Sequence, residues 1–136
     1  MMQVVVAAIA YFVLIFGAGF CLGAVRELAV RPALGATVGI IIEVPLMLAI
    51  AWGAAGFVSR RFSLRGRGEA IATGVGAFVI LIAAEMMLFS ALSGRPALEL
   101  TGEWATVGGM IGLAAQVLSA AFPALRVAAD ARRRAY

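Results

Sequence analysis

The sequence predicts an all-α membrane protein, a single domain over residues 1–136 with four transmembrane helices in an antiparallel bundle. Three observations support this fold class. The 136 residues are 64% hydrophobic, with a mean hydropathy of +1.06. Only 13% are charged, whereas about a quarter of a soluble domain is charged. Four apolar segments are also long enough to cross the hydrocarbon core of a bilayer, which takes about 20 residues.

The expected spans cover about residues 4–25, 34–58, 69–92 and 104–125. Charged and turn-forming residues separate them, in "RELAVRPALG", "SRRFSLRGRGE" and "SGRPALELTGEW". No secretory signal peptide is expected, because "MMQ" has no basic start and the first apolar run has the length of a span. Residues 126–136 are expected to form a short basic tail.

The arginines predict the orientation of the chain. The second loop and the tail hold eight of them: Arg60, Arg61, Arg65, Arg67, Arg126, Arg132, Arg133 and Arg134. The first and third loops together hold three, Arg26, Arg31 and Arg95. Because loops rich in arginine stay on the cytoplasmic side, both termini are predicted to be cytoplasmic.

The composition argues against several classes of function. There is no histidine, so the commonest metal ligand, the usual haem ligand and the usual near-neutral general base are missing. The single cysteine, Cys21, excludes an intrachain disulfide. No metal, no cofactor and no enzymatic activity are therefore expected. The arginines lie at helix ends, so the basic pI follows from topology and predicts no nucleic-acid partner.

Charged residues within the spans form the main candidate site. Glu43 stands in "GIIIEVPLML", where a charge costs a few kcal/mol unless it is paired. At about 1.5 Å per residue, a slab roughly 10 Å below the outer surface contains Arg26, Glu27, Glu43 and Glu85. The helical phase predicts that Arg26 and Glu43 face each other and form an ion pair. Pro45 lacks an N–H and is expected to kink the second span.

Small residues repeat along the spans at a spacing of four. This spacing lets helix backbones approach closely in a membrane. The pattern predicts either a tightly packed bundle or a face that docks a partner protein or a second copy of the chain. The pairs are Gly19 and Gly23, Gly35 and Gly39, and Gly108 and Gly112.

The segments "GFCLGAVRELAVRPALG", "IIEVPLML" and "AAEMMLFSALSG" resemble a group of small four-span inner-membrane proteins of Proteobacteria. The resemblance covers most of the chain and implies a multi-pass protein of the bacterial inner membrane, with "VRE" paired to "EVP". It implies no activity. Small multidrug-resistance transporters have a similar length but carry a glutamate within their first helix, where this chain has none before Glu27. Fluoride channels have asparagine-rich pore motifs, and this chain has no asparagine.

Two functions remain open from the sequence. The first is an accessory subunit that binds a larger membrane complex, or itself, through its glycine-rich helix faces. The alternative is a small oligomeric transporter, coupled to protons or cations, that uses Glu43 and Glu85 together with Arg26. Both place the protein in the lipid bilayer.

Overall fold

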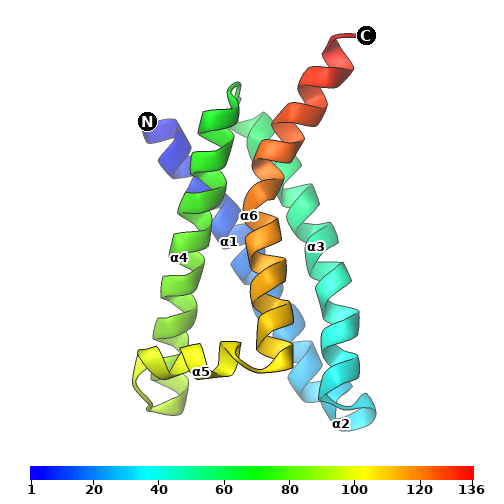
Figure 1. The fold of residues 1–136 in the computed structure, drawn as a ribbon, viewed down its shortest axis with the longest axis vertical. Coiled ribbons are helices and arrows are strands. Elements are labelled where there is room, and N and C mark those ends of the chain that lie inside the picture. The colour runs from blue at the N-terminus through cyan, green and yellow to red at the C-terminus, as the bar shows by residue number, and fades with distance from the viewer.

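The computed structural model describes residues 1–136, and all of its secondary structure is helical. Four helical segments are long and apolar enough to cross a membrane: Met2–Leu34, Ala36–Arg61, Arg67–Ser93 and Val107–Arg134. The chain is thus consistent with a small integral membrane protein with four spans. Met1, Tyr136 and the loop at residues 62–66 lie at one end of the molecule, called here the termini end (Figure 1). The opposite end is called the far end.

The first span is longer than the sequence predicts, because the helix does not stop near residue 25. α1 (Met2–Val25) continues into a π-helical turn, η1 (Arg26–Val30), and then into α2 (Arg31–Leu34). Because Pro32 has no N–H, it cannot donate the backbone hydrogen bond that would continue a regular α-helix through this turn. The helix finally ends at Gly35, whose φ of +86° favours glycine. Gly35 is thus a turn residue rather than a contact between helices.

α3 (Ala36–Arg61) passes through Pro45 as one continuous helix. It ends in a Schellman motif, in which Leu64 N–H donates to the Ser59 carbonyl at 2.9 Å and Ser63 N–H donates to the Arg60 carbonyl at 3.2 Å. Ser63 takes the left-handed position, with φ of 49°. The side chain of Leu64 is buried in the core, so the loop between α3 and α4 is anchored to the bundle.

α4 (Arg67–Ser93) ends at Gly94, which has φ of 67°. A short helical turn, η2 (Ala97–Glu99), and a short helix, α5 (Leu100–Trp104), then lie across the far end (Figure 1). The last long helix, α6 (Val107–Arg134), is capped by Thr106, whose hydroxyl accepts from Gly109 N–H at 3.1 Å. Trp104 therefore lies in α5 and not in the fourth span, and the expected tail is mostly helical.

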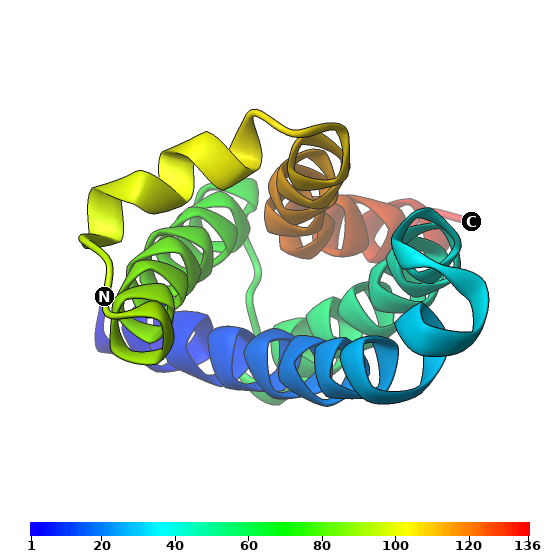
Figure 2. The same cartoon turned by 90° about the horizontal axis from the view of Figure 1, so that it is seen from below.

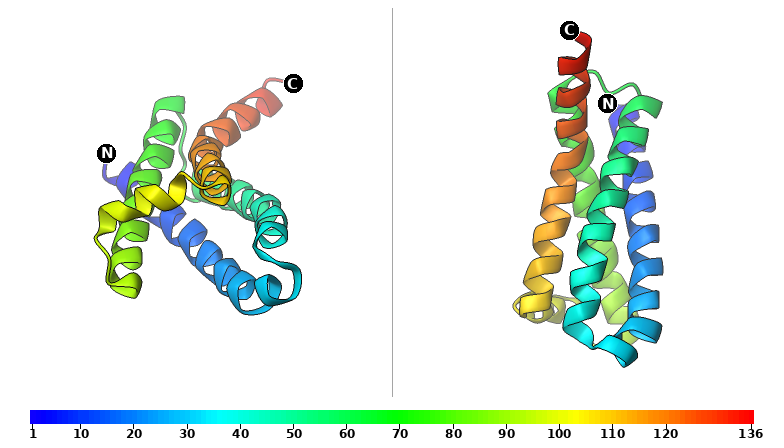
Figure 3. Two further views of the ribbon diagram at one scale, coloured as in Figure 1. Left: turned by 60° about the horizontal axis from the view of Figure 1, so that its bottom comes forward. Right: turned by 90° about the vertical axis from the view of Figure 1, so that its right-hand side faces the viewer.

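The four long helices form a ring of neighbours. α1 packs against α3 and α4, and α6 packs against the same two helices. α1 and α6 therefore lie diagonally opposite each other, as the view along the bundle shows (Figure 2). Two further views show the four long helices side by side, with the last turns of α6 projecting beyond the others at the termini end (Figure 3).

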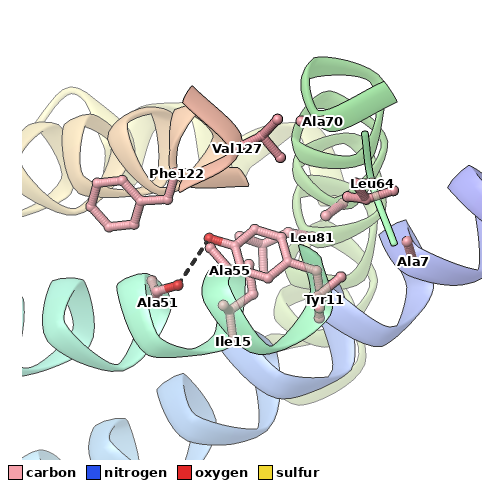
Figure 4. Close-up of a cluster of buried hydrophobic side chains, with 12 residues drawn as sticks. Ala7, Tyr11, Ile15, Ala51, Ala55, Leu64, Ala70, Leu81, Phe122 and Val127 are labelled. Atoms are coloured by element: carbon pink, nitrogen blue, oxygen red, sulfur yellow. Dashed lines mark hydrogen bonds between the residues drawn. The ribbon is translucent and has the colours of Figure 1, made fainter. Parts of the chain in front are cut away.

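The hydrophobic core lies in the half of the bundle nearer the termini end, because its residues come from the first parts of α1 and α4 and the later parts of α3 and α6. Figure 4 shows these side chains. It contains many small side chains, which let the backbones approach closely. The closest approach is at Gly74 in α4, where a Cβ would overlap with the carbonyl oxygen of Ala120 in α6. The core residues are Ala7, Tyr11, Ile15, Ala51, Ala55, Val58, Leu64, Ala70, Ala77, Leu81, Phe122 and Val127.

A buried hydrogen bond joins the diagonal helices through this core. Tyr11 Oη in α1 donates to the Ser119 carbonyl in α6 at 2.7 Å. That carbonyl is four residues before Pro123, a fully buried proline inside α6. Proline has no N–H to satisfy the carbonyl in the helix, so Tyr11 supplies the missing donor.

Candidate functional site

A cavity of about 520 Å³ occupies the other half of the bundle. It extends from Glu27 and Thr106 near the far end to Ser119, beside the Tyr11 hydrogen bond. All four long helices contribute to its wall. Its polar residues are Arg26, Glu27, Glu43, Glu85, Glu103, Thr106, Gln116 and Ser119, and its large apolar residues are Ile15, Phe16, Phe20, Ile40, Val44, Met47, Leu81 and Leu88.

Arg26 stands at the centre of the charged wall. Its Nη1 lies 2.5 Å from Glu43 Oε2, and its Nε lies 3.3 Å from Glu27 Oε1. Glu27 also contacts Arg31 at 2.7 Å. Arg26 and Glu27 are the first two residues of the π-helical turn. A π turn shifts the phase of the side chains that follow it, and such turns are frequent at functional sites.

Glu85 has a different environment from the other carboxylates. It lies on α4 and accepts a hydrogen bond from Gln116 Nε2 on α6 at 2.6 Å. No arginine nitrogen lies within 4.0 Å of it, so it is not part of the Arg26 ion pairs. The Oε1 atom of Gln116 is shielded from water and has no hydrogen-bond partner. This pair therefore leaves both an uncompensated carboxyl and a free acceptor on the cavity wall.

Glu103 and Thr106 belong to the segment that covers the far end. Glu103 lies 3.6 Å from Arg95, and Arg95 also pairs with Glu99 at 2.7 Å. The hydrogen bond to Glu99 raises the pKa of the Arg95 guanidinium, so Arg95 stays charged. Of the four cavity carboxylates, Glu85 is thus the only one without an arginine partner.

The predicted glycines mostly line the cavity instead of packing helices together. A Cβ at Gly23 or Gly112 would meet no atom within 4 Å, and one at Gly19 would touch only Met47 at 3.8 Å. Gly108 approaches the Ile40 side chain, and Gly39 lies against the Arg26 side chain. The absence of side chains at these positions makes room for the cavity and for Arg26.

Several relevant residues were not identified from the sequence. Gln116 is one of them, since its contact with Glu85 was not predicted. Arg126 was expected in the tail, whereas its Nε donates to the Trp52 carbonyl at 3.2 Å and its guanidinium lies 4.3 Å from the Trp52 ring centroid. The spacing of Gly108, Gly112 and Gln116 on one helix face was the available signal for the first residue. No feature of the sequence distinguishes Arg126 from the other arginines near the C-terminus.

No three potential metal ligands of the types histidine, cysteine, aspartate and glutamate converge in the structure. No protein-family model matches the chain, and no curated protein or solved structure is significantly similar to it.

Proposed function

We propose that this protein is a small multi-pass transporter of the bacterial inner membrane that binds a cationic substrate, or a coupling proton, in the cavity at Glu85. The observation that carries the proposal is the position of Glu85, which faces a cavity of about 520 Å³ without a cationic side chain within 4.0 Å. That volume is within the range of small-molecule sites. Ionisable groups within a membrane span are expensive and commonly mark ion or substrate pathways.

The composition of the wall favours a positively charged ligand with an apolar part. Four carboxylates and one guanidinium line the cavity, together with aromatic and aliphatic side chains. Arg26 compensates Glu43 and Glu27, which leaves Glu85 to attract the positive charge of the ligand.

In the proposed mechanism the cavity opens toward the periplasm. The excess of arginines at the termini end supports a cytoplasmic location for that end, which places the far end outside. The core around Tyr11 closes the path toward the cytoplasm, so transport requires a second state in which this core opens. Competition between a proton and the substrate for Glu85 would couple proton transport to substrate transport.

The alternative role as an accessory subunit stays a prediction. The sequence predicts this role from glycine-rich helix faces that could dock a partner. Gly19, Gly23, Gly108 and Gly112 all line the cavity, so these faces offer less support for a docked partner than for a ligand inside the bundle. Assembly into a homo-oligomer fits either function.

Reconstituted vesicles would test the proposal. A pH gradient, acidic outside the vesicles, should drive exchange of phenyltrimethylammonium for protons, recorded by a pH-sensitive dye trapped inside. Glu85→Gln should abolish the exchange, because the amide removes the uncompensated carboxyl. Glu99→Gln, outside the cavity, is the matched control and should retain it. Equal exchange by wild type, Glu85→Gln and protein-free vesicles would refute the transport function.

A further inference from the structure

A second pocket, of about 530 Å³, lies at the termini end and is separate from the cavity. Two segments far apart in the sequence form it, the last turn of α3 with the loop that follows and the last turns of α6. Its charged residues are Arg60, Arg65, Arg134 and Asp130. Three guanidinium groups and one carboxylate give it a formal charge of +2, and no ion pair within 4.0 Å involves any of these four residues.

A buried hydroxyl without a hydrogen-bond partner is a second feature that favours a ligand in this pocket. Ser59 is only 5% exposed and lines the pocket, and its hydroxyl oxygen has no hydrogen-bond partner. Buried polar groups are nearly always hydrogen-bonded, so an exception needs an explanation. The Ser59 hydroxyl is thus a buried donor without a partner in the wall of a pocket whose formal charge is +2.

The pocket is built on an anchored backbone. The Schellman motif fixes Ser63 and Leu64 against the end of α3, and Leu64 is buried in the core. On the opposite wall, Val127 of α6 is also part of the core. Arg60 and Arg65 therefore flank a fixed loop, while Arg134 comes from the last turn of α6.

We propose that this pocket binds a phosphate group, and that its source is the headgroup of an anionic phospholipid such as phosphatidylglycerol. Guanidinium groups pair with phosphate oxygens through charge-assisted hydrogen bonds. The pocket lies where the spans end in arginines, at the level of lipid headgroups, and basic pockets between helices on the cytoplasmic side are suited to such lipids. A soluble phosphate compound would use the same contacts, so the test separates the two sources.

Equilibrium binding would be measured on the full chain in neutral detergent, titrated with phosphatidylglycerol, phosphatidylcholine or inorganic phosphate. Native mass spectrometry would count the bound molecules. Wild type should bind one phosphatidylglycerol in preference to phosphatidylcholine. The triple variant Arg60→Gln, Arg65→Gln and Arg134→Gln should lose about 100-fold in affinity, since each arginine near a membrane surface is worth about 1 kcal/mol.

The matched control is the triple variant Arg61→Gln, Arg132→Gln and Arg133→Gln, which removes the same charge from the same end but outside the pocket. It should retain stoichiometric binding. Equal loss in both triple variants, or no preference for phosphatidylglycerol over phosphatidylcholine, would overturn the proposal. Comparable binding of inorganic phosphate in the pocket would support the phosphate site and assign it to a soluble ligand.

Ser59→Ala separates ligand binding from folding. The unliganded variant should be at least as stable as wild type, because the change removes a buried hydroxyl without a partner. Its affinity for phosphatidylglycerol should fall by about ten- to a hundredfold, the value of one hydrogen bond to a charged group. Unchanged affinity would show that Ser59 does not contact the phosphate.

Discussion

At the scale of single residues, some buried polar groups have an ion-pair or hydrogen-bond partner and others have none. Glu43 has Arg26 and the Ser119 carbonyl has Tyr11. Gln116 Oε1 and Ser59 Oγ have none. The satisfied groups hold the fold together, and the unsatisfied ones line the two pockets to which ligands are assigned.

Arg26→Ala is expected to destabilise the protein because it leaves Glu43 without its counter-charge. Removing one partner of a buried pair costs about 3–5 kcal/mol. Arg26 and Glu43 side chains are 30% and 16% exposed, so a loss of about 1–3 kcal/mol is expected here. Thermal unfolding in detergent would measure it. Arg31→Ala, an exposed arginine in a surface pair, is the control, and the addition of Glu43→Gln should restore stability. Equal melting temperatures for Arg26→Ala and Arg31→Ala would contradict the buried pair.

Tyr11→Phe removes the donor to the Ser119 carbonyl and keeps the ring. Since Pro123 offers no N–H to that carbonyl, it would be left unsatisfied in the core, at a cost of about 1–3 kcal/mol. Tyr136→Phe, at the exposed C-terminus, should have no effect. The same unfolding assay applies, and a variant as stable as wild type would show that another donor replaces Tyr11.

At the scale of helices, glycine has two opposite uses in this protein. At Gly74 it permits α4 and α6 to touch, whereas at Gly23 and Gly112 it leaves space. The spacing of four residues is the same in both cases. A sequence pattern alone therefore cannot say whether a small residue brings two helices together or lines a cavity between them.

Gly74→Ala should separate α4 from α6, because the new Cβ overlaps with the backbone oxygen of Ala120. Overpacking of this kind costs about 1–3 kcal/mol. Gly53→Ala on the exposed face of α3 meets no atom within 4 Å and should be neutral or slightly stabilising, because alanine favours helix. Chemical unfolding of both variants would check the difference. Should Gly74→Ala be as stable as Gly53→Ala, the close contact would be refuted.

At the scale of the whole molecule, the half nearer the termini end holds the hydrophobic core and the other half holds the cavity. The four spans and the common depth of Arg26 and Glu43 could be predicted, because span length and rise per residue depend only on chain geometry. The contact of Glu85 with Gln116 could not be predicted, because it depends on the rotation of α4 and α6 about their axes and on the distance between them. The π turn and α5 were also missed, since short helical segments between charges have no apolar periodicity of their own.

Filling the cavity should block transport without unfolding the protein. Gly112→Leu would introduce a large side chain into space where a Cβ meets no atom within 4 Å. Gly53→Leu adds the same bulk on an exposed face. The exchange of phenyltrimethylammonium for protons in reconstituted vesicles should be lost only in Gly112→Leu. Both variants should keep a wild-type melting temperature. Undiminished exchange in Gly112→Leu would mean that the substrate does not pass through the cavity.

A cation site at Glu85 would be tested by the binding of phenyltrimethylammonium to the purified protein, measured by calorimetry against benzenesulfonate, an anion with the same ring. Saturable binding of the cation that disappears in Glu85→Gln and persists in Glu99→Gln is the predicted result. Equal affinity for cation and anion, or unchanged binding of the cation by Glu85→Gln, would contradict a cation site at Glu85.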